Sequence, residues 1–376
     1  MKIVIAGGKL QAVEAVYLAR QLGWQSIVVD RNARAPAAEM ADHFVCSEIS
    51  DHKKLLPLIR GGDVVLPALE AEDALALLGV YCQETGTPYL FDPDAYRLSS
   101  SKLACDRFFR EQGIPAPRYY PEAEFPLIVK PSGQSGSRGV RTVASAGELK
   151  GIDRREYVIQ EFFRGPSYSV EVIGWGASFE ILEITEIIID AQFDCKAVVA
   201  PAAISARTKL EMLEIAWRLA QLMQICGIFD IEVVQTPHGL KVLEIDARLP
   251  SQTPISVWHS SGVNMLERLY AYHMSDPAPR QPRADRVCIY KQIAVDGRAI
   301  TSLGEHILTD QGPLHIMPGQ FGATNMITNY VPDAQRWVAA VIVCAETQAQ
   351  AEQEFRQVIM NIQAAQGPGA WEYREG

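Results

Sequence analysis

Hydrophobic and polar positions alternate along the first 97 residues in the rhythm of strands and helices. Short apolar runs at 3–5, 26–29 and 63–67 predict buried strands, and an amphipathic stretch at 14–22 predicts a helix. Strands that alternate with helices in this way form a parallel sheet covered by those helices. Residues 1–97 are therefore expected to fold as an N-terminal half-Rossmann domain.

The turn after the first strand reads Gly7-Gly8-Lys9-Leu10-Gln11, and Asp30 closes the second strand. An acid at this distance from a glycine turn is typical of dinucleotide-binding domains, where it bonds a ribose hydroxyl. The turn lacks the spaced glycines of the GxGxxG pattern. A domain that binds another ligand at this turn, or none, is therefore favoured over a dehydrogenase.

Residues 98–276 carry further strand and helix patterns. Helices are expected at 102–112 and 208–226, and strands at 127–130, 157–160, 169–173, 179–189, 228–234 and 240–245. The last two strands flank Thr236-Pro237-His238-Gly239 and predict a hairpin. The proline- and arginine-rich stretch 277–286 predicts a boundary, beyond which 277–376 is expected to form a small α/β domain with a helix near 346–365.

Composition and charge narrow the classes of protein. Apolar residues make up 48% and charged residues 21%, as in globular proteins. The net charge of -10 argues against a nucleic-acid binder and against a polybasic membrane anchor. Seven isolated cysteines without CxxC spacing indicate a reduced, cytoplasmic chain. No apolar run approaches the roughly 18 residues needed to span a bilayer.

Three carboxylates on the predicted hairpin are the strongest candidate site. Side chains recur on one face of a strand every second position, so Glu244 and Asp246 point the same way and Glu232 can lie opposite them. Converging carboxylates repel one another unless a cation lies between them, and oxygen ligands of this kind suit Mg²⁺ on a nucleotide's phosphates. A solvated sheet face is the alternative, and the apolar residues between the acids argue against it.

Two lysines flank a flexible glycine-rich loop. Lys102 precedes one helix, and Lys130 closes the strand before residues 132–139, which hold three glycines and three serines. Such a loop lets backbone N–H groups approach phosphate oxygens, although the GxxxxGK[ST] pattern of P-loop proteins is absent. We expect a mobile lid that becomes ordered over a nucleotide. Downstream, the segment Gln160-Glu161-Phe162-Phe163 ends an apolar strand and can form an adenine slot, or only a core strand and turn.

Taken in this order, these residues resemble the ATP-grasp superfamily of carboxylate–amine ligases. The likeness runs through Lys102, Lys130, the loop 132–139, Glu161 and the acids, including Glu244-Ile245-Asp246-Ala247-Arg248. The resemblance implies an α/β fold with lid (about 125–185) and central ATP-grasp domains, and ATP with Mg²⁺ as cofactors. Most members carry Asn where Asp246 stands, which makes this site more anionic.

A narrower resemblance is to the ligases of pyrrolysine biosynthesis, which join 3-methylornithine to L-lysine. It rests on the turn 7–11, on 95–97 and on the run from Glu244 to Gly262, and covers about residues 1–310. It implies that a carboxylate attacks ATP to give an acyl phosphate, from which an amine displaces phosphate. Another ATP-grasp amino-acid or dipeptide ligase, a carboxylase, and a pseudoenzyme that only binds ATP remain alternatives. A homodimer is left open.

The resemblance also assigns roles to single residues. Metal ligands are Glu232, Glu244 and Asp246, and Arg248 and Asp230 are the catalytic candidates. ATP contacts are expected from Lys102, Lys130, Ser135, Gln160, Glu161, Phe162 and Phe163. Small amino-acid substrates are expected at Lys9, Leu10, Gln11, Glu70, Ser169, Glu171, Asp230, Ser251, Gln252, Thr253 and Glu305. A lysine ε-amine must lose a proton before it attacks, and Asp230 and Glu70 are candidate bases.

Overall fold

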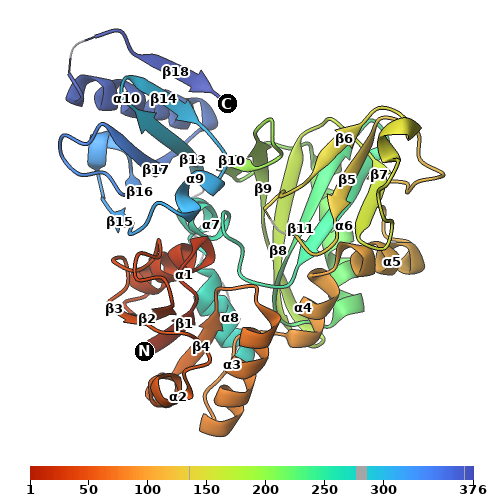
Figure 1. Cartoon of the computed structure of the whole chain (residues 1–376), viewed down its shortest axis with the longest axis horizontal. Helices are drawn as coiled ribbons and strands as arrows, with labels where there is room; N and C mark the ends of the chain where they lie inside the picture. The colour runs from red at the N-terminus through yellow and green to blue at the C-terminus, as the bar shows by residue number, and fades with distance from the viewer. Residues whose placement is uncertain (135, 277–285, 368) are drawn as a thin grey trace.

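The computed structural model describes residues 1–134, 136–276, 286–367 and 369–376. Three β-sheets organise these residues (Figure 1). A four-stranded sheet belongs to the N-terminal region, a three-stranded sheet stands apart from it, and an 11-stranded sheet runs through the rest of the molecule. The predicted α/β class is confirmed.

The N-terminal sheet has the order β3-β2-β1-β4, and all its pairings are parallel. Its strands are β1 (Lys2–Ala6), β2 (Gln25–Asp30), β3 (His43–Cys46) and β4 (Val64–Pro67). Its helices are α1 (Leu10–Gln21), α2 (His52–Arg60) and α3 (Glu72–Thr85). The half-Rossmann expectation is confirmed, except that α1 begins at Leu10, directly after the glycine turn, rather than at residue 14.

Close packing explains the glycine turn. A Cβ at Gly7 would lie 2.2 Å from the carbonyl oxygen of Ala68, and Gly7 has a φ of +105°. The Gly8 backbone N–H donates to Asp30 Oδ2 at 2.7 Å. Asp30 thus stabilises the turn itself.

The three-stranded sheet has the antiparallel order β6-β5-β7. Its strands are β5 (Leu127–Pro131), β6 (Arg141–Val143) and β7 (Tyr157–Glu161), with the short helix η1 (Ala146–Leu149). The helices α4 (Pro93–Ser99) and α5 (Lys102–Gln112) precede it along the chain, and α5 ends at Gly113 in the left-handed conformation, as expected. Within the predicted lid of about 125–185, this sheet ends at Glu161, and the following strands belong to the large sheet.

The large sheet has the order β12-β11-β8-β9-β10-β13-β17-β16-β15, with β14 paired to β13 and β18 paired to β14. Its strands are β8 (Ser167–Trp175), β9 (Ser178–Ile189), β10 (Cys195–Ala200), β11 (Cys226–Thr236), β12 (Gly239–Asp246), β13 (Val287–Asp296), β14 (Ala299–Ser302), β15 (His315–Ile316), β16 (Asn325–Thr328), β17 (Arg336–Ala345) and β18 (Glu372–Glu375). The predicted hairpin is the pair β11–β12. The expected boundary at 277–286 falls almost wholly outside the described residues, and the sheet continues across it because β10 pairs with β13.

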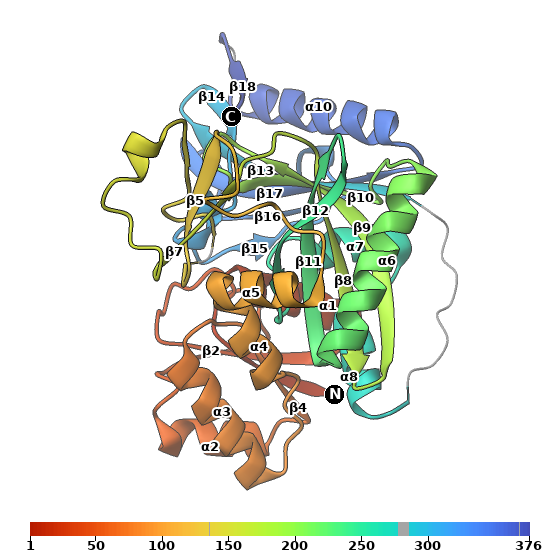
Figure 2. The ribbon, with the colours of Figure 1, turned by 90° about the vertical axis from the view of Figure 1, so that its right-hand side faces the viewer.

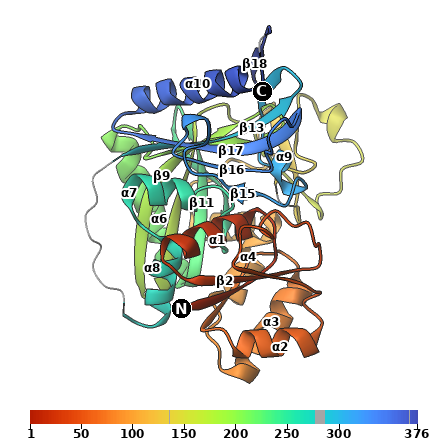
Figure 3. The same ribbon diagram turned by 90° about the vertical axis from the view of Figure 1, so that its left-hand side faces the viewer.

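Several helices pack on this sheet (Figures 2 and 3). They are α6 (Ala206–Met223), α7 (Pro254–Ser261), α8 (Met265–His273), α9 (His306–Thr309) and α10 (Gln348–Ala365), with the short helix η2 (Gln320–Gly322). Helix α6 packs on β8, β9 and β12, and α10 packs on β13 and β17. Helices α7 and α8 contact α1, so they join the large sheet to the N-terminal domain.

Candidate active site

Six polar side chains share one face of the large sheet where β8, β11 and β12 run side by side. They are Ser169, Glu171, Asp230, Glu232, Glu244 and Asp246. Antiparallel pairing sets Glu232 opposite Glu244 and Asp230 opposite Asp246. The predicted convergence of acids across the hairpin is confirmed, and we call Asp230, Glu232, Glu244 and Asp246 the carboxylate cluster.

The residues between these acids point into the core beneath α6. Val170, Ile231 and Ile245 are fully buried and belong to one apolar cluster with Met212 and Leu219 of α6. A one-residue slip of the strands would exchange the two faces and bury the carboxylates, at several kcal/mol for each unpaired charge. The apolar face therefore sets the direction in which the acids point.

The surroundings of each carboxylate in the cluster separate their pKa values. Burial opposes ionisation of Glu244, but the Lys102 ammonium, 2.7 Å away, and Lys130 bring its pKa down to about 2. Burial, reinforced by the charge of Glu244, raises the pKa of Glu232 to about 8, and burial raises that of Asp246 to about 6. A divalent cation among these oxygens would favour their ionised forms, so the donor set fits Mg²⁺.

Arg248 connects the cluster to the N-terminal domain. Its Nε lies 3.1 Å from Glu70 Oε1, and its Nη2 lies 3.2 Å from Asp246 Oδ2. Gln11 of α1 donates a hydrogen bond to the same Glu70 oxygen at 3.0 Å. Glu70, which was expected to bind an acceptor ammonium, therefore pairs with Arg248 in this structure.

Two cavities meet beside Arg248. The first, of about 360 Å³, is bounded by the carboxylate cluster, Lys102, Ser169 and residues 250–253. The second, of about 1000 Å³, lies at the carboxyl ends of the N-terminal strands, where ligands collect in open parallel sheets, and residues 9–11 line it. Both linings include Glu70, Gly136, Asp194, Arg248, Ser251 and Glu305, which we call the junction.

The remaining predicted substrate residues divide between cavity wall and interior. Ser169, Gln252 and Thr253 line the first cavity. Glu171 is fully buried, accepts hydrogen bonds from the hydroxyls of Ser169 and Thr253, and is not among the residues described for either lining. Burial raises its pKa to about 7. Glu305 accepts a hydrogen bond from Ser251 Oγ at 3.0 Å, and burial raises its pKa to about 7 as well.

Of the predicted nucleotide contacts in the described residues, Lys102 alone belongs to a cavity wall. Lys102 lines the first cavity and donates to the Gln134 carbonyl at 3.2 Å. Lys130 is buried, and this burial lowers its pKa despite the nearby carboxylates. Among the described lining residues of both cavities, neither Lys130 nor any of residues 160–163 appears. Ser135 lies outside the described residues.

Residues 160–163 have other partners. Glu161 accepts hydrogen bonds from the backbone N–H of Arg118 at 2.9 Å and from its Nε at 2.7 Å. Phe162 meets Phe193 edge-on, with ring centroids 5.7 Å apart. The Gln160 side chain is buried, and its Nε2 finds no partner within the described part of the chain. A buried amide without a partner is costly, so Gln160 is the residue of this segment best suited to bond a polar ligand.

The sequence analysis predicted no role for Asp194 and His306, although both lie in the cavity walls. Asp194 follows β9 and belongs to the junction, and His306 begins α9 and lines the second cavity. Neither lies in a motif, and 112 positions separate them along the chain. The pairing of β10 with β13 brings their regions together.

Comparison with known proteins agrees with this geometry. Residues 99–252 match the ATP-grasp domain family. Over 324 residues, 84% of this chain and 87% of the relative, the sequence is 36% identical to a 3-methyl-D-ornithine–L-lysine ligase of Methanosarcina acetivorans. The chain belongs to the ATP-grasp family. The resemblance inferred from the motifs is thereby confirmed.

Solved structures extend the ATP-grasp assignment to the whole fold. N5-carboxyaminoimidazole ribonucleotide synthetase from Thermotoga maritima superposes with a TM-score of 0.66 at 21% identity, over 96% of this chain and 98% of that one. The biotin carboxylase domain of a Hydrogenobacter thermophilus 2-oxoglutarate carboxylase, in complex with MgADP, gives 0.72 at 15% identity, over 96% and 89%. Across the described residues, this ATP-grasp chain has no helix long and apolar enough to cross a membrane.

Proposed function

We propose that this chain is an ADP-forming ligase that joins the carboxylate of 3-methylornithine to the ε-amine of L-lysine, the step that builds the amide of the pyrrolysine precursor. The carboxylate attacks the γ-phosphorus of ATP, which releases ADP and forms an acyl phosphate. The amine then adds to the acyl carbon, phosphate leaves, and one proton is released. The relative of 36% identity is named for this pair of substrates.

The observation that carries the proposal is the position of Arg248. It lies between the carboxylate cluster on one side and the cavity of the N-terminal domain on the other, and both cavities include it in their walls. A donor carboxylate activated beside the cluster and an amine held in the second cavity would meet at this guanidinium. Its charge suits the phosphoryl group that develops during transfer.

The nucleotide and metal occupy the cluster side in this proposal. Glu232, Glu244 and Asp246 hold Mg²⁺, which neutralises phosphate charge when it is bound. Lys102 and Lys130 direct ammonium charge at the phosphates. Ser135 and residues 160–163 complete the ATP site, and the MgADP bound to the biotin carboxylase relative supports a nucleotide in a protein of this fold.

The two amino acids occupy separate compartments. We assign the ornithine-like donor to the first cavity, beside Ser169, Asp230, Ser251, Gln252, Thr253 and Glu305, with the buried Glu171 bonded to Ser169 and Thr253. We assign lysine to the second cavity, beside Lys9, Leu10, Gln11 and Glu70. Carboxylates in both compartments suit substrates that carry a second ammonium group, because an uncharged side chain would leave a buried acid without its partner.

Three coarser features belong to the same proposal. The domain limits are 1–97, 98–276 and 277–376, with a lid over about 125–185. We also propose a cytoplasmic protein. The seven cysteines are all free thiols, which suits a reducing compartment.

A product screen tests the function directly. The chain is incubated with ATP, Mg²⁺ and pairs of amino acids, and mass spectrometry identifies amide products while a coupled assay follows ADP. We expect ADP release that needs both a basic donor and lysine, with a product that is one water lighter than their sum.

Other outcomes of the screen separate the alternatives. Comparable turnover with alanine or leucine would favour a general dipeptide ligase, and turnover that needs bicarbonate would favour a carboxylase. Nucleotide binding without ADP release under every condition would favour a pseudoenzyme.

A further inference from the structure

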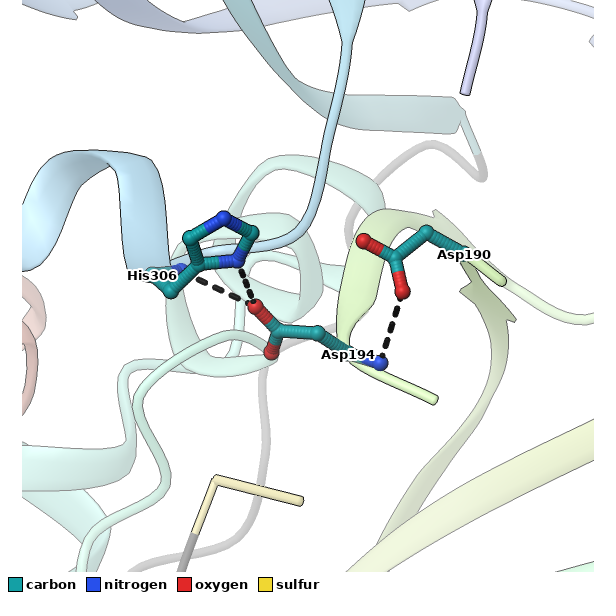
Figure 4. Close-up of side chains that lie close together, drawn as sticks. All are labelled: Asp190, Asp194 and His306. Atoms are coloured by element: carbon teal, nitrogen blue, oxygen red, sulfur yellow. Dashed lines mark hydrogen bonds and ion pairs between the residues drawn. The ribbon is translucent and has the colours of Figure 1, made fainter. Parts of the chain in front are cut away.

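Asp190, Asp194 and His306 form a compact cluster beside the junction, and no role predicted from the sequence covers them (Figure 4). The two aspartates belong to the turn between β9 and β10, and the histidine is the first residue of α9. One ligand atom from each side chain lies within 4.8 Å of the others. The cluster therefore joins the central part of the sheet to the region that follows residue 286.

The aspartates hold the imidazole in one orientation. His306 Nδ1 lies 2.5 Å from Asp194 Oδ2, and the backbone N–H of His306 donates to the same oxygen at 3.0 Å. The backbone N–H of Asp194 donates to Asp190 Oδ1 at 3.0 Å, and that of Gly304 donates to Asp190 Oδ2 at 3.1 Å. Any Cβ at Gly304 would lie 2.2 Å from Asp194 Oδ2, so only glycine permits this approach.

This orientation leaves the opposite edge of the ring available. Because Asp194 accepts at Nδ1, a neutral His306 carries its hydrogen there and keeps the lone pair on Nε2. Figure 4 shows that nitrogen on the ring edge away from Asp194. The Asp194 side chain is only 8% exposed, whereas that of His306 is 60% exposed and lines the second cavity.

We propose that His306 is the general base that takes a proton from the acceptor ammonium group through Nε2, with Asp194 as its positioning residue. This inference rests on the proposed function, because it assumes an amine that enters from the second cavity. The N–H bond of the ammonium breaks, its electron pair stays on nitrogen, and the proton binds Nε2. The freed amine then attacks the acyl phosphate, and the imidazolium returns its proton to solvent.

The other candidate bases are less suited to this step. Glu70 is paired with Arg248 and also accepts from Gln11. Asp230 is buried among the other acids of the carboxylate cluster, and among the described lining residues it belongs to the first cavity and not to the second. His306 lines the second cavity, and Asp194 contacts its Nδ1 rather than its Nε2.

A structural metal ion is the alternative use of the same three side chains. Asp190 Oδ1 and Oδ2 and Asp194 Oδ2 already accept hydrogen bonds from backbone N–H groups, and an ion would have to displace several of them. These bonds favour a histidine held by carboxylates over a metal centre.

The test separates amine deprotonation from every other step by changing the acceptor. Hydroxylamine is largely unprotonated at neutral pH and attacks acyl phosphates, so it needs no base. Wild type, His306→Gln and Asp194→Asn are assayed with ATP, Mg²⁺ and donor, with either lysine or hydroxylamine as acceptor. His315→Gln is the matched control, because His315 pairs with Glu39 and lies outside the described linings of both cavities.

With lysine at pH 7, His306→Gln should lower kcat by roughly 10²–10⁴-fold, the usual range for a general base. Asp194→Asn should lower it less, and His315→Gln should leave it unchanged. With hydroxylamine, all variants should form hydroxamate at the wild-type rate. The deficit with lysine should shrink as pH rises toward about 10, where the ε-amine loses its own proton.

The charged groups that line the same cavity also bear on this pH profile. Besides His306, the described lining holds Lys9, Asp30, Arg31, Glu48, Glu70, Asp73, Arg138, Asp194, Arg248 and Glu305. We therefore also measure kcat of Glu305→Gln with lysine as a function of pH. We expect its loss of activity to be the same at every pH, because Glu305 binds substrate and does not take the proton from the amine.

Three results would overturn the role of His306. They are a wild-type kcat of His306→Gln with lysine at pH 7, an equal loss with lysine and hydroxylamine, and a loss with lysine that does not change with pH. If wild type forms no hydroxamate from any donor, no acyl phosphate is made, and the proposed function itself is wrong. That last outcome is seen in wild type alone, so a failure of the proposed function can be told apart from a failure of the role of His306.

Discussion

The carboxylate cluster and the predicted nucleotide residues were inferred from the same kind of pattern, but the structure treats them differently. The cluster belongs to one continuous antiparallel sheet, and all of its acids line the first cavity. Lys130, Gln160 and Glu161 lie on a separate three-stranded sheet, Phe162 and Phe163 follow it, and the described cavity walls include none of them. Register within a sheet follows from alternation, whereas the placement of one sheet against another does not.

Catalysis should be more sensitive to a substitution in the carboxylate cluster than to one among the predicted nucleotide residues. Glu244→Gln removes one charge without changing side-chain size, and Glu244 faces both Glu232 and Lys102. We expect kcat for ADP release to fall by roughly 10²–10³-fold, because electrostatic groups at developing charge contribute about that much. Circular dichroism should be unchanged, and the exposed Glu354→Gln on α10 serves as the control. Activity near wild type would remove Glu244 from the metal site.

Substitution of a predicted nucleotide residue should weaken the affinity for ATP. Lys130→Met keeps the length of a buried side chain but deletes its ammonium group. We expect KM for ATP to rise roughly ten- to hundredfold, since hydrogen bonds to charged groups contribute about 1.5–3 kcal/mol. The exposed Lys150→Met, on the same part of the chain, should leave KM unchanged.

Hydrogen exchange in the glycine-rich loop gives a second measurement of nucleotide binding. Exchange over 132–134 and 136–139 should slow in wild type when a non-hydrolysable ATP analogue and Mg²⁺ are added, and should not slow in Lys130→Met at the same concentrations. Equal exchange with and without nucleotide in wild type would contradict a lid at this loop.

Buried acids next to the cluster should make stability depend on pH. Glu171 has a pKa of about 7 in the folded chain, above its ordinary value. Folded protein thus retains a proton that unfolded protein has released, and this carboxyl destabilises the fold progressively as pH rises from about 4.5 to 7. Glu171→Gln cannot ionise, so in urea unfolding it should be more stable than wild type by about 1–3 kcal/mol at pH 8 and equal to it near pH 4.5. A gain of the same size at both pH values would show that ionisation is not its cause.

The smallest effect on KM for ATP is expected at Glu161, because its partner is exposed to solvent. Glu161 pairs with Arg118, whose side chain is 59% exposed. Exposed ion pairs contribute up to about 1 kcal/mol, so Glu161→Gln should raise KM for ATP by less than about fivefold and shift stability by a similarly small amount. Arg118→Gln should match it. A much larger rise in KM for Glu161→Gln alone would show that Glu161 contacts the nucleotide directly.

Local rules left some details of the N-terminal domain open. The sequence disfavoured a dehydrogenase at the glycine turn, and in the structure the Asp30 carboxylate accepts a hydrogen bond from the backbone N–H of Gly8. Helix α1 begins at Leu10 because the chain turns directly into it after Gly8, so residues 10–13 are buried in the helix rather than extended before it. The local pattern could not fix where α1 begins, because Leu10, Ala12 and Val13 are buried by packing against distant parts of the chain.

The sequence by itself determined the elements whose evidence is local. Alternation along β11 and β12 placed Glu232, Glu244 and Asp246 on one face, because the apolar residues between them must be buried. Only the tertiary structure decided which distant groups meet there. Arg248 reaches Glu70 across 178 residues, and His306 reaches Asp194 across 112, after β10 has paired with β13. Contacts of this range leave no periodicity in the sequence, since they arise from how whole sheets and helices pack and not from the spacing of neighbours along one strand.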